Sequence, residues 1–289
     1  ITYAGADFII GEDATLGKNF KWKTDEEKGD ESNLVFILGV LARLRVQEAD
    51  IVVGLPVRDA ENKKKRDSLK SMFTGIKTAV VNGKPMVFDI NTNVVAEPLG
   101  TYFSLVLDED SKPIRTSPFF HDEMAIIDIG HRTVDIVTLR GGKLAATKDS
   151  TSSGAVTMFE KAEKWLEKEY GALKPNERVK VHFTIVNNYG SPTLKVGGEF
   201  VRPDFWDVVA KLKAQLAKDI MDEVKTILNN IQPDRMLITG GGAELLKREV
   251  LAIDKSLIFH EDPKFANAIG FYRVARAQRY HGAASPIPS

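Results

Sequence analysis

The segment from Asp128 to Asp135, with the sequence DIGHRTVD, brings together residue types that can bind a phosphate group. It connects two strongly apolar runs, so Asp128 is expected at the end of a buried strand that holds its carboxylate rigidly. Successive backbone N–H groups in such a turn can converge on an anion, and Thr133 can add a hydroxyl donor. Asp128 can hold a hydrated Mg²⁺ ion against a polyphosphate. By itself, the same pattern also fits an ordinary turn between two strands.

A second segment, ITGGGA, contains three consecutive glycines, Gly240, Gly241 and Gly242. Three residues without a Cβ atom allow a ligand or a neighbouring backbone to approach closely, and the helix that follows offers N–H donors at its start. A tight turn from a strand into a helix explains the glycines equally well. The spacing matches neither G-x-x-x-x-G-K-[ST] nor G-x-G-x-x-G, so the common nucleotide-binding motifs are not supported.

The third candidate is Glu97, which precedes Pro98 and a helix that begins with small residues. A carboxylate in this place can orient a water molecule for attack on a phosphoryl group, as a positioning base and not as a covalent nucleophile. The alternative is a residue at the start of a helix, stabilised by the helix dipole.

The pattern of apolar residues around these motifs predicts alternating strands and helices, which is typical of an α/β protein. Predicted strands at 124–129 and 134–139 flank the Asp128 motif. Further strands are predicted at 51–56, at two places within 78–95 around an Asn82-Gly83 turn, at 143–148, in a mixed β region at 179–201 and at 235–239. Predicted helices cover about 33–49, a charged segment around 63–66, 100–107, 155–170, 204–231, the residues after Gly242, and 267–280.

Composition excludes several classes of function. The 40 basic and 40 acidic residues give a formal net charge of zero, so no field draws the chain to nucleic acid or to an anionic membrane. There is no cysteine, and the five histidines show no metal-binding spacing. No apolar run reaches the roughly 20 residues of a membrane span. We therefore expect a cytoplasmic protein that binds neither nucleic acid directly nor a membrane.

The order of the three motifs along the chain is more specific than any one of them. Together with the long helix before the glycines, it resembles the actin, Hsp70 and hexokinase ATPase superfamily, and in particular the actin-like ATPases of the ParM plasmid-segregation type. The resemblance spans about residues 8–275 and is carried by the segments IVVGLP, AEPLGTYF, IIDIGHRTVDIV, LITGGGAELL and DPKFANAIGFYR.

The resemblance implies an actin-like fold of two α/β domains of the ribonuclease H-like type, with ATP or ADP and Mg²⁺ in a cleft between them. By position, Asp128 would hold Mg²⁺ through water and Glu97 would polarise the attacking water. The second phosphate-binding hairpin would consist of Gly130, His131, Arg132 and Thr133, and the adenosine would lie against Gly240, Gly241 and Gly242. The ribose contact stays open among Lys211, Lys213, Lys218 and Glu223, and the choice between ATP and GTP also stays open.

The resemblance also predicts how the chain is divided. Residues 1–125 would form the remainder of the first domain, 126–262 the second domain, 263–280 a helix returning to the first, and 281–289 a disordered tail. The first phosphate hairpin of the family has no match before Gly29, and the family pattern begins at about FIIGEDATLGKNFKWK. We expect an N-terminal segment that carries this hairpin to precede Ile1. The alternative is a degenerate member of the family that lacks it.

The predicted function is that of an ATPase that couples hydrolysis to assembly into filaments, in plasmid or DNA segregation or as a cytoskeleton. The expected partners are further copies of the chain and an adaptor or DNA-partition protein. One alternative is a small-molecule kinase or another phosphotransferase of the same superfamily, although no clear acceptor site is visible. Another is a structural protein that retains nucleotide without hydrolysing it.

Overall fold

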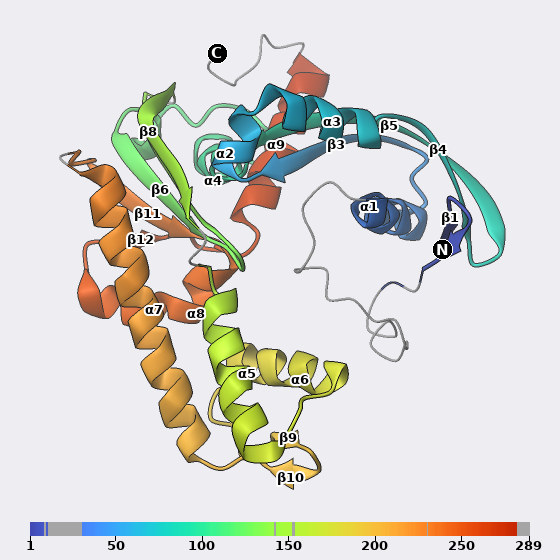
Figure 1. The fold of residues 1–289 in the computed structure, drawn as a ribbon. Coiled ribbons are helices and arrows are strands. Elements are labelled where there is room, and N and C mark those ends of the chain that lie inside the picture. The colour runs from blue at the N-terminus through green and yellow to red at the C-terminus, as the bar shows by residue number, and fades with distance from the viewer. Residues whose placement is uncertain (9, 11–30, 142, 152–153, 230, 282–289) are drawn as a thin grey trace. The chain divides into compact units, whose positions relative to one another are not determined.

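The computed structural model describes residues 1–8, 10, 31–141, 143–151, 154–229 and 231–281 (Figure 1). Most of the segment 8–23 and of the tail 281–289, on which two of the sequence predictions fall, lies outside these residues. The chain divides into two compact units. Unit 1 contains Ile1–Pro113 and the C-terminal helix from Ala268 onward, and unit 2 contains Ile114–Asn267.

Unit 1 is built on a five-stranded sheet with the strand order β2-β1-β4-β5-β3. β3 pairs in parallel with β5, and β4 and β5 form an antiparallel hairpin closed by Asn82 and Gly83. Both turn residues have positive φ, as a two-residue type I′ turn requires, so this predicted hairpin is confirmed. The strands are β1 (Thr2–Tyr3), β2 (Ala6–Asp7), β3 (Glu48–Leu55), β4 (Gly75–Val81) and β5 (Lys84–Ala96).

The helices of unit 1 include a close crossing of α4 and α9. A Cβ atom on Gly270 would overlap the carbonyl oxygen of Gly100, so the two backbones touch here. Arg273 strengthens the crossing by donating hydrogen bonds to the carbonyl groups of Ser104 and Leu107 at the end of α4. The helices are α1 (Glu31–Leu44), α2 (Val57–Glu61), α3 (Lys63–Phe73), α4 (Glu97–Val106) and α9 (Ala266–His281), of which the first two residues belong to unit 2.

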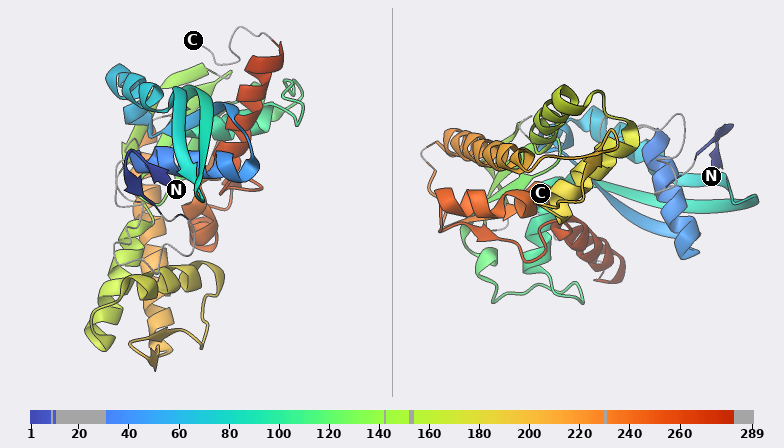
Figure 2. Two further views of the ribbon diagram at one scale, coloured as in Figure 1. Left: turned by 90° about the vertical axis from the view of Figure 1, so that its right-hand side faces the viewer. Right: turned by 90° about the horizontal axis from the view of Figure 1, so that it is seen from below.

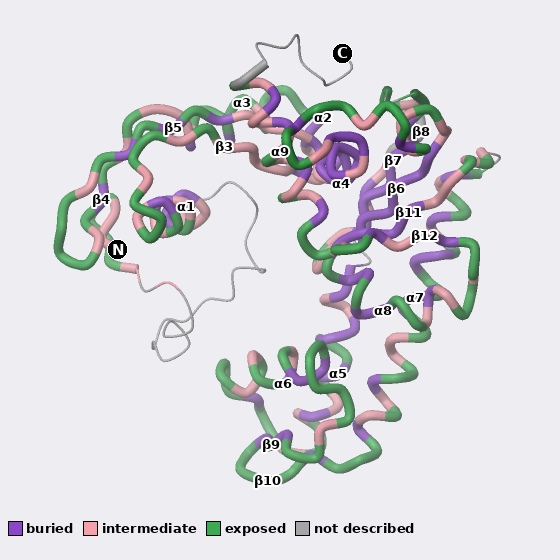
Figure 3. The backbone as a smooth tube through the Cα atoms, turned by 180° about the vertical axis from the view of Figure 1, so that it is seen from behind, coloured by how far each residue is buried: buried purple, intermediate pink, exposed green. Residues whose placement is uncertain are grey.

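Unit 2 is built on a second five-stranded sheet, with the order β12-β11-β6-β7-β8. β6, β7 and β8 form an antiparallel meander, and β11 lies parallel to both β6 and β12. β6 and β7 are buried along almost their whole length, as the purple tube in Figure 3 shows. The strands are β6 (Glu123–Ile129), β7 (Val134–Arg140), β8 (Lys143–Thr151), β11 (Arg235–Thr239) and β12 (Ile258–Phe259). The predicted strands on both sides of the Asp128 motif are therefore confirmed.

The helices of unit 2 pack against one face of this sheet and against one another. Ile127, Ile136 and Ile238 contribute that face to the core, which the apolar stripes of α5, α7 and α8 complete. α5, α6 and α7 lie together in all the ribbon views (Figures 1 and 2). The remaining elements are η3 (Pro118–Phe120), α5 (Val156–Tyr170), α6 (Pro175–Asn187), β9 (Lys195–Val196), β10 (Glu199–Phe200), α7 (Asp204–Leu228) and α8 (Gly241–Ile253).

The predicted mixed β region at 179–201 is wrong. Its first part belongs to α6, and only β9 and β10 form a short antiparallel pair. The β-branched residues of this segment misled the prediction, whereas burial of Val181, Thr184 and Ile185 follows helical spacing. Pro175 at the start of α6 and Glu177 in its first turn are the helix signals that outweigh the β propensity.

The predicted helix at 33–49 is too long at its C-terminal end. α1 ends at Leu44, and residues from Glu48 onward form β3. Leu34, Val35, Leu38 and Leu41 of α1 are buried, while Phe36, Val40 and Leu44 are exposed. None of the helices in the described part of the chain combines the length and the apolar character needed to cross a membrane.

Candidate functional site

Three buried polar residues form a row across unit 2, at the edge where β6 and β11 end. Asp128 on β6 is paired with Asp135 on β7 and with Thr239 on β11, so the three side chains lie on one face of the sheet. Their exposed fractions are 5% for Asp128, 1% for Asp135 and 0% for Thr239. Two carboxylates directly opposite each other in a sheet repel, so this pair needs donors or a cation beside it.

The Asp128 carboxylate is fixed from two sides. The side-chain amide of Asn267 donates a hydrogen bond to Oδ2, with 2.6 Å between the two atoms. On the other side, Oδ1 lies where a Cβ atom of Gly240 would be, so only glycine fits there. The backbone N–H of Gly240 donates to the carbonyl of Pro263, which holds the glycine turn close to the segment that carries Asn267. The carboxylate is therefore held in one orientation before any ligand arrives.

The turn from Gly130 to Thr133 is oriented by the start of α5. The backbone N–H groups of Ala155, Val156 and Gly154 donate to the carbonyls of residues 130, 131 and 132, at 3.1, 2.7 and 3.1 Å. In a trans peptide the C=O and N–H groups point in opposite directions. Because three successive carbonyls face α5, the N–H groups of His131, Arg132 and Thr133 point away from it. Successive amides aligned in this way form a concave site suited to a phosphate group.

The hydroxyl of Thr133 is directed to a protein group. Its Oγ1 donates to Oδ2 of Asp135, with 2.9 Å between the atoms. This bond supplies a donor to the more deeply buried carboxylate of the pair. Thr133 therefore offers its backbone N–H to an anion, and its hydroxyl stabilises Asp135.

The three glycines after β11 have different surroundings. A Cβ atom on Gly240 or Gly242 would collide with Ile129, at the end of β6, so both glycines are required for packing. Gly240 also has a φ of +90°, which disfavours any residue with a side chain. Gly241 is exposed, and no atom lies within 4 Å of a Cβ atom placed on it. Only Gly241 therefore leaves space for a ligand.

The acidic residues of the row fit Mg²⁺ held mainly by water and phosphate. Among the described residues there is no group of three or more His, Asp or Glu side chains that could enclose a metal ion. Mg²⁺ usually keeps several waters and takes one or two carboxylates together with the phosphates of its substrate. Asp128 and Asp135, the buried acidic pair, supply two carboxylates, which matches this number.

Glu97 lies in unit 1, at the first residue of α4. It is half-buried, and its Cγ would be 2.6 Å from a Cβ atom on Gly54 of β3. The ring of Phe271 from α9 also borders this position, at 3.0 Å from the same Cβ atom. β3, α4 and α9 therefore meet around the Glu97 side chain. Unit 2 by itself brings together the hairpin residues and the glycines, and Glu97 is not among them.

The four candidates for a ribose contact lie on α7 and differ in exposure. Lys211 and Lys218 are exposed, and Glu223 is half-buried with an Oε2 atom that has no hydrogen-bond partner. Lys213 lies 3.6 Å from Glu249 of α8 and over the ring of Tyr189. Burial, and then the charge of Glu249, raise the pKa of the Tyr189 hydroxyl. Lys213 is thus already paired with Glu249. Exposure and pairing together do not select one of the four as the ribose contact.

Sequence reasoning missed two features of this site. Asn267 lies in the segment DPKFANAIGFYR, and the signal was a polar side chain just inside the start of a helix. Gly154 packs directly against the hairpin, because a Cβ atom there would collide with the carbonyl of His131. Nothing in the sequence near Gly154 indicates that contact, because it joins segments more than 20 residues apart.

Comparisons with known proteins find actin-like matches for both parts of the chain. Residues 1–100 match the family described as the N-terminal domain of actin-like proteins, and residues 126–252 match the C-terminal family of archaeal MreB-like actin homologues. A search of curated proteins finds no match.

Several solved structures share the fold. A non-polymerisable quadruple mutant of pCBH ParM has a TM-score of 0.70 and 18% identity, covering 91% of this chain and 81% of that one. Bacillus thuringiensis ParM with ATP has a TM-score of 0.62 and 16% identity, with 89% and 76% covered. An archaeal actin homologue in complex with ADP has a TM-score of 0.64 and 19% identity, with 88% and 81% covered.

Two α/β units, each on a five-stranded sheet, together with these matches define the actin-like fold. The chain therefore has the actin-like fold, its two parts match two families of actin-like proteins, and ParM proteins are among its structural neighbours.

Proposed function

We propose that this protein is an actin-like ATPase that binds Mg-ATP and couples its hydrolysis to assembly into filaments. The observation that carries the proposal is the turn after Asp128, whose three carbonyls face α5 and whose N–H groups face the opposite way. Relatives of the same fold have been solved with ATP and with ADP, and one as a non-polymerisable mutant. These neighbours support the proposal.

The hairpin would bind the phosphate groups of the nucleotide, and the acidic pair would bind its metal ion. The N–H groups of His131, Arg132 and Thr133 donate to phosphate oxygens, and Asp128 would hold Mg²⁺ through water. Bound Mg²⁺ neutralises charge that develops on the phosphate oxygens. Asn267 keeps Asp128 in one rotamer, so the protein does not have to reorganise when the nucleotide binds.

Gly241 is the position against which we place the adenosine. It is the exposed member of the glycine triplet, and an added Cβ atom there would meet no protein atom. The flat face of a base can lie on a backbone without a side chain, so affinity there depends on the absence of a Cβ atom.

Glu97 is the proposed catalytic residue. Its carboxylate accepts a hydrogen bond from the attacking water and orients that water for in-line displacement at the terminal phosphoryl group. Glu97 lies in the first turn of α4, where the helix dipole stabilises a negative charge. Assembly into filaments, and the binding of partners such as an adaptor or a DNA-partition protein, would then depend on which nucleotide is bound.

A test uses purified protein with ATP and Mg²⁺, measuring nucleotide binding, phosphate release and sedimentation of assemblies. Glu97→Gln should retain ATP binding within about twofold and lose roughly 100-fold or more of the hydrolysis rate. Glu160→Gln, at an exposed position on α5, serves as the control and should behave as the unmodified protein. Failure of the unmodified protein to bind ATP would refute the proposal. Binding without hydrolysis and without ATP-dependent sedimentation would identify a nucleotide-retaining structural protein instead.

A further inference from the structure

Three aromatic rings form a continuous stack that leads away from the phosphate hairpin. The ring of His131, in the turn itself, stacks on Phe159 of α5 with a centroid separation of 5.9 Å and an interplanar angle of 28°. Phe159 stacks on His182 of α6 at 4.3 Å and 26°. Phe159 is only 4% exposed, so it fills the space between the two histidines. The imidazole of His131 therefore packs on α5.

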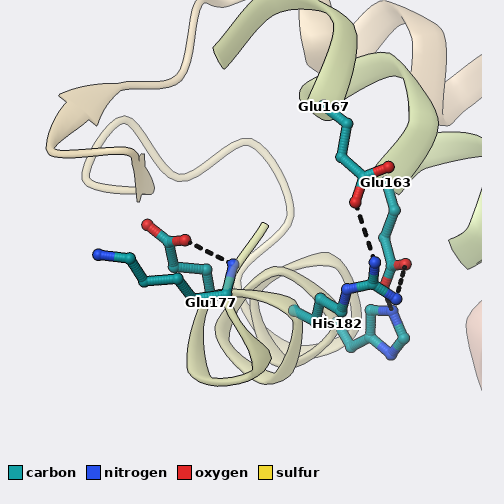
Figure 4. A network of polar contacts seen from close by, with 6 residues as sticks. Glu163, Glu167, Glu177 and His182 are labelled. Atoms are coloured by element: carbon teal, nitrogen blue, oxygen red, sulfur yellow. Dashed lines mark hydrogen bonds and ion pairs between the residues drawn. The ribbon is translucent and has the colours of Figure 1, made fainter. Parts of the chain in front are cut away.

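The far end of the stack is fixed by charge (Figure 4). Nε2 of His182 donates to Oε1 of Glu163, with 2.7 Å between the atoms. The same carboxylate lies 3.3 Å from the guanidinium of Arg178, which also donates to Glu167. The Glu163 side chain is only 10% exposed, so these partners offset the cost of burying its charge. His182 is thus held in one orientation against Phe159.

The stack contacts the same turn that is hydrogen-bonded to the backbone at the start of α5. Amides at the start of α5 bind the three hairpin carbonyls, and one helical turn later Phe159 holds the His131 ring. A shift of α5 or α6 would therefore change where the N–H groups of the turn point. Conversely, a ligand bound to those N–H groups must favour the stacked arrangement by the same free energy.

We propose that Phe159 and His182 are positioning residues for nucleotide binding, acting through His131 to hold the phosphate hairpin. The inference rests on the proposed function, because it concerns affinity for Mg-ADP or Mg-ATP at that hairpin. His131 then contributes its backbone N–H to the phosphate, and its ring is the anchor.

The test measures the Kd for ADP with Mg²⁺ by calorimetry and records histidine ring signals by NMR. In the unmodified protein, ring protons of two histidines should be shifted by the neighbouring Phe159 ring and should move when ADP is added. Phe159→Leu, which keeps apolar volume but removes the ring, should abolish both effects and weaken ADP binding about tenfold. His182→Gln alters a partly exposed residue, so it tests the same prediction if Phe159→Leu folds poorly; its ADP affinity should also fall.

Two matched controls change residues of the same types, one of them on α6, that are not part of the stack. His121→Gln removes an exposed histidine of unit 2, and Phe183→Leu removes an exposed ring of α6; both should leave the Kd unchanged. Stack variants that lower only the unfolding free energy, with the ADP affinity and its NMR response retained, would overturn the positioning role alone. Absence of ADP binding by the unmodified protein would overturn the proposed function as well.

Discussion

The side-chain amide of Asn267 donates a 2.6 Å hydrogen bond to Asp128, across 139 residues of sequence. Asn267 is the second residue of α9, and the chain passes from unit 2 to unit 1 directly after it. The residue that orients the proposed metal-binding carboxylate is therefore also the residue at which the chain leaves unit 2 for unit 1. A change in the position of either residue must strain or break this bond.

Asn267→Ala should weaken Mg²⁺-dependent nucleotide binding. Without the amide donor, the Asp128 carboxylate loses one of the contacts that orient it, and loss of such an outer partner typically lowers metal affinity 10- to 100-fold. A fluorescent ADP analogue titrated with Mg²⁺ would show the midpoint rising about tenfold, while ADP binding in the presence of EDTA stays the same. Asn176→Ala, at an exposed position on α6, is the control. Equal Mg²⁺ midpoints in the two variants would show that Asn267 does not position Asp128.

Gly240 and Gly241 should respond in opposite ways to substitution by alanine. Gly240→Ala places a methyl group onto Asp128 and Ile129 at a positive φ, so it should lower the unfolding free energy by about 3 kcal/mol. Gly241→Ala meets no protein atom in the first turn of α8, so the unfolding free energy should stay the same or rise by up to about 1 kcal/mol. Chemical denaturation of the nucleotide-free protein measures both.

The same Gly241→Ala protein also tests the adenosine contact. A methyl group at this open position should weaken binding of ATP severalfold without any loss of stability. Inorganic pyrophosphate, which lacks the nucleoside, is the control ligand and should bind equally to both proteins. An unchanged affinity for ATP would show that the nucleoside does not lie against Gly241.

How far the sequence predicted the structure depended on whether the signal was local. The hairpin at Asn82 and Gly83 was predictable because both positions need positive φ, which these two residues accept. The strands on either side of the Asp128 motif were predictable because they are buried on both faces and consist mostly of apolar residues. In each case one short segment contains its own physical explanation.

The failures have a different cause. α6 was missed because its β-branched residues suggest strands, and the helix is selected by burial of Val181 and Ile185. The bond from Asn267 to Asp128 and the stack of Phe159 on His131 join residues far apart in the chain. No pattern in a single sequence specifies which distant side chains meet. The types of the site residues could therefore be anticipated, but not the partners that orient them.

Glu177 should give unit 2 a dependence on acid pH. Backbone N–H groups of Lys174 and Gly197 donate to its carboxylate at 2.9 and 2.8 Å, and these bonds lower the pKa of Glu177 below its ordinary value. A group with a lowered folded-state pKa stabilises the fold above its unfolded pKa, and this contribution is lost as pH falls through the folded value. Glu177→Gln should therefore be less stable at neutral pH, by about 1 kcal/mol or less for so exposed a group.

Two measurements check this dependence. The amide proton of Gly197 should titrate at the lowered pKa of Glu177 in the unmodified protein and should not titrate in Glu177→Gln. The difference in unfolding free energy between the two proteins should shrink as the pH is lowered toward that pKa. A difference that stays constant from neutral to acid pH would show that the carboxylate charge is not the stabilising element.

Gly54→Ala should slow hydrolysis by displacing Glu97. The added methyl group would lie 2.6 Å from Cγ of Glu97 and 3.0 Å from the ring of Phe271, so the flexible Glu97 side chain must move. Misplacement of a catalytic group by about 1 Å can cost on the order of 100-fold in rate. We expect the kcat for ATP to fall at least tenfold while the Kd for ATP changes less than twofold, because Gly54 belongs to unit 1 and the residues proposed to bind phosphate belong to unit 2. Single-turnover phosphate release measures the rate without the product-release step.

Combining Gly54→Ala with Glu97→Gln separates this displacement from a general loss of structure. If the methyl group acts only by moving Glu97, it should cost almost nothing further once the carboxylate is absent, and the two effects should be far from additive. Additive losses would mean that Gly54→Ala disturbs unit 1 more widely, through Phe271 and the packing of α9. The control is Ala79→Gly, on β4 of the same sheet, which should leave kcat unchanged. Gly83→Ala is unsuitable as a control because Gly83 has a positive φ.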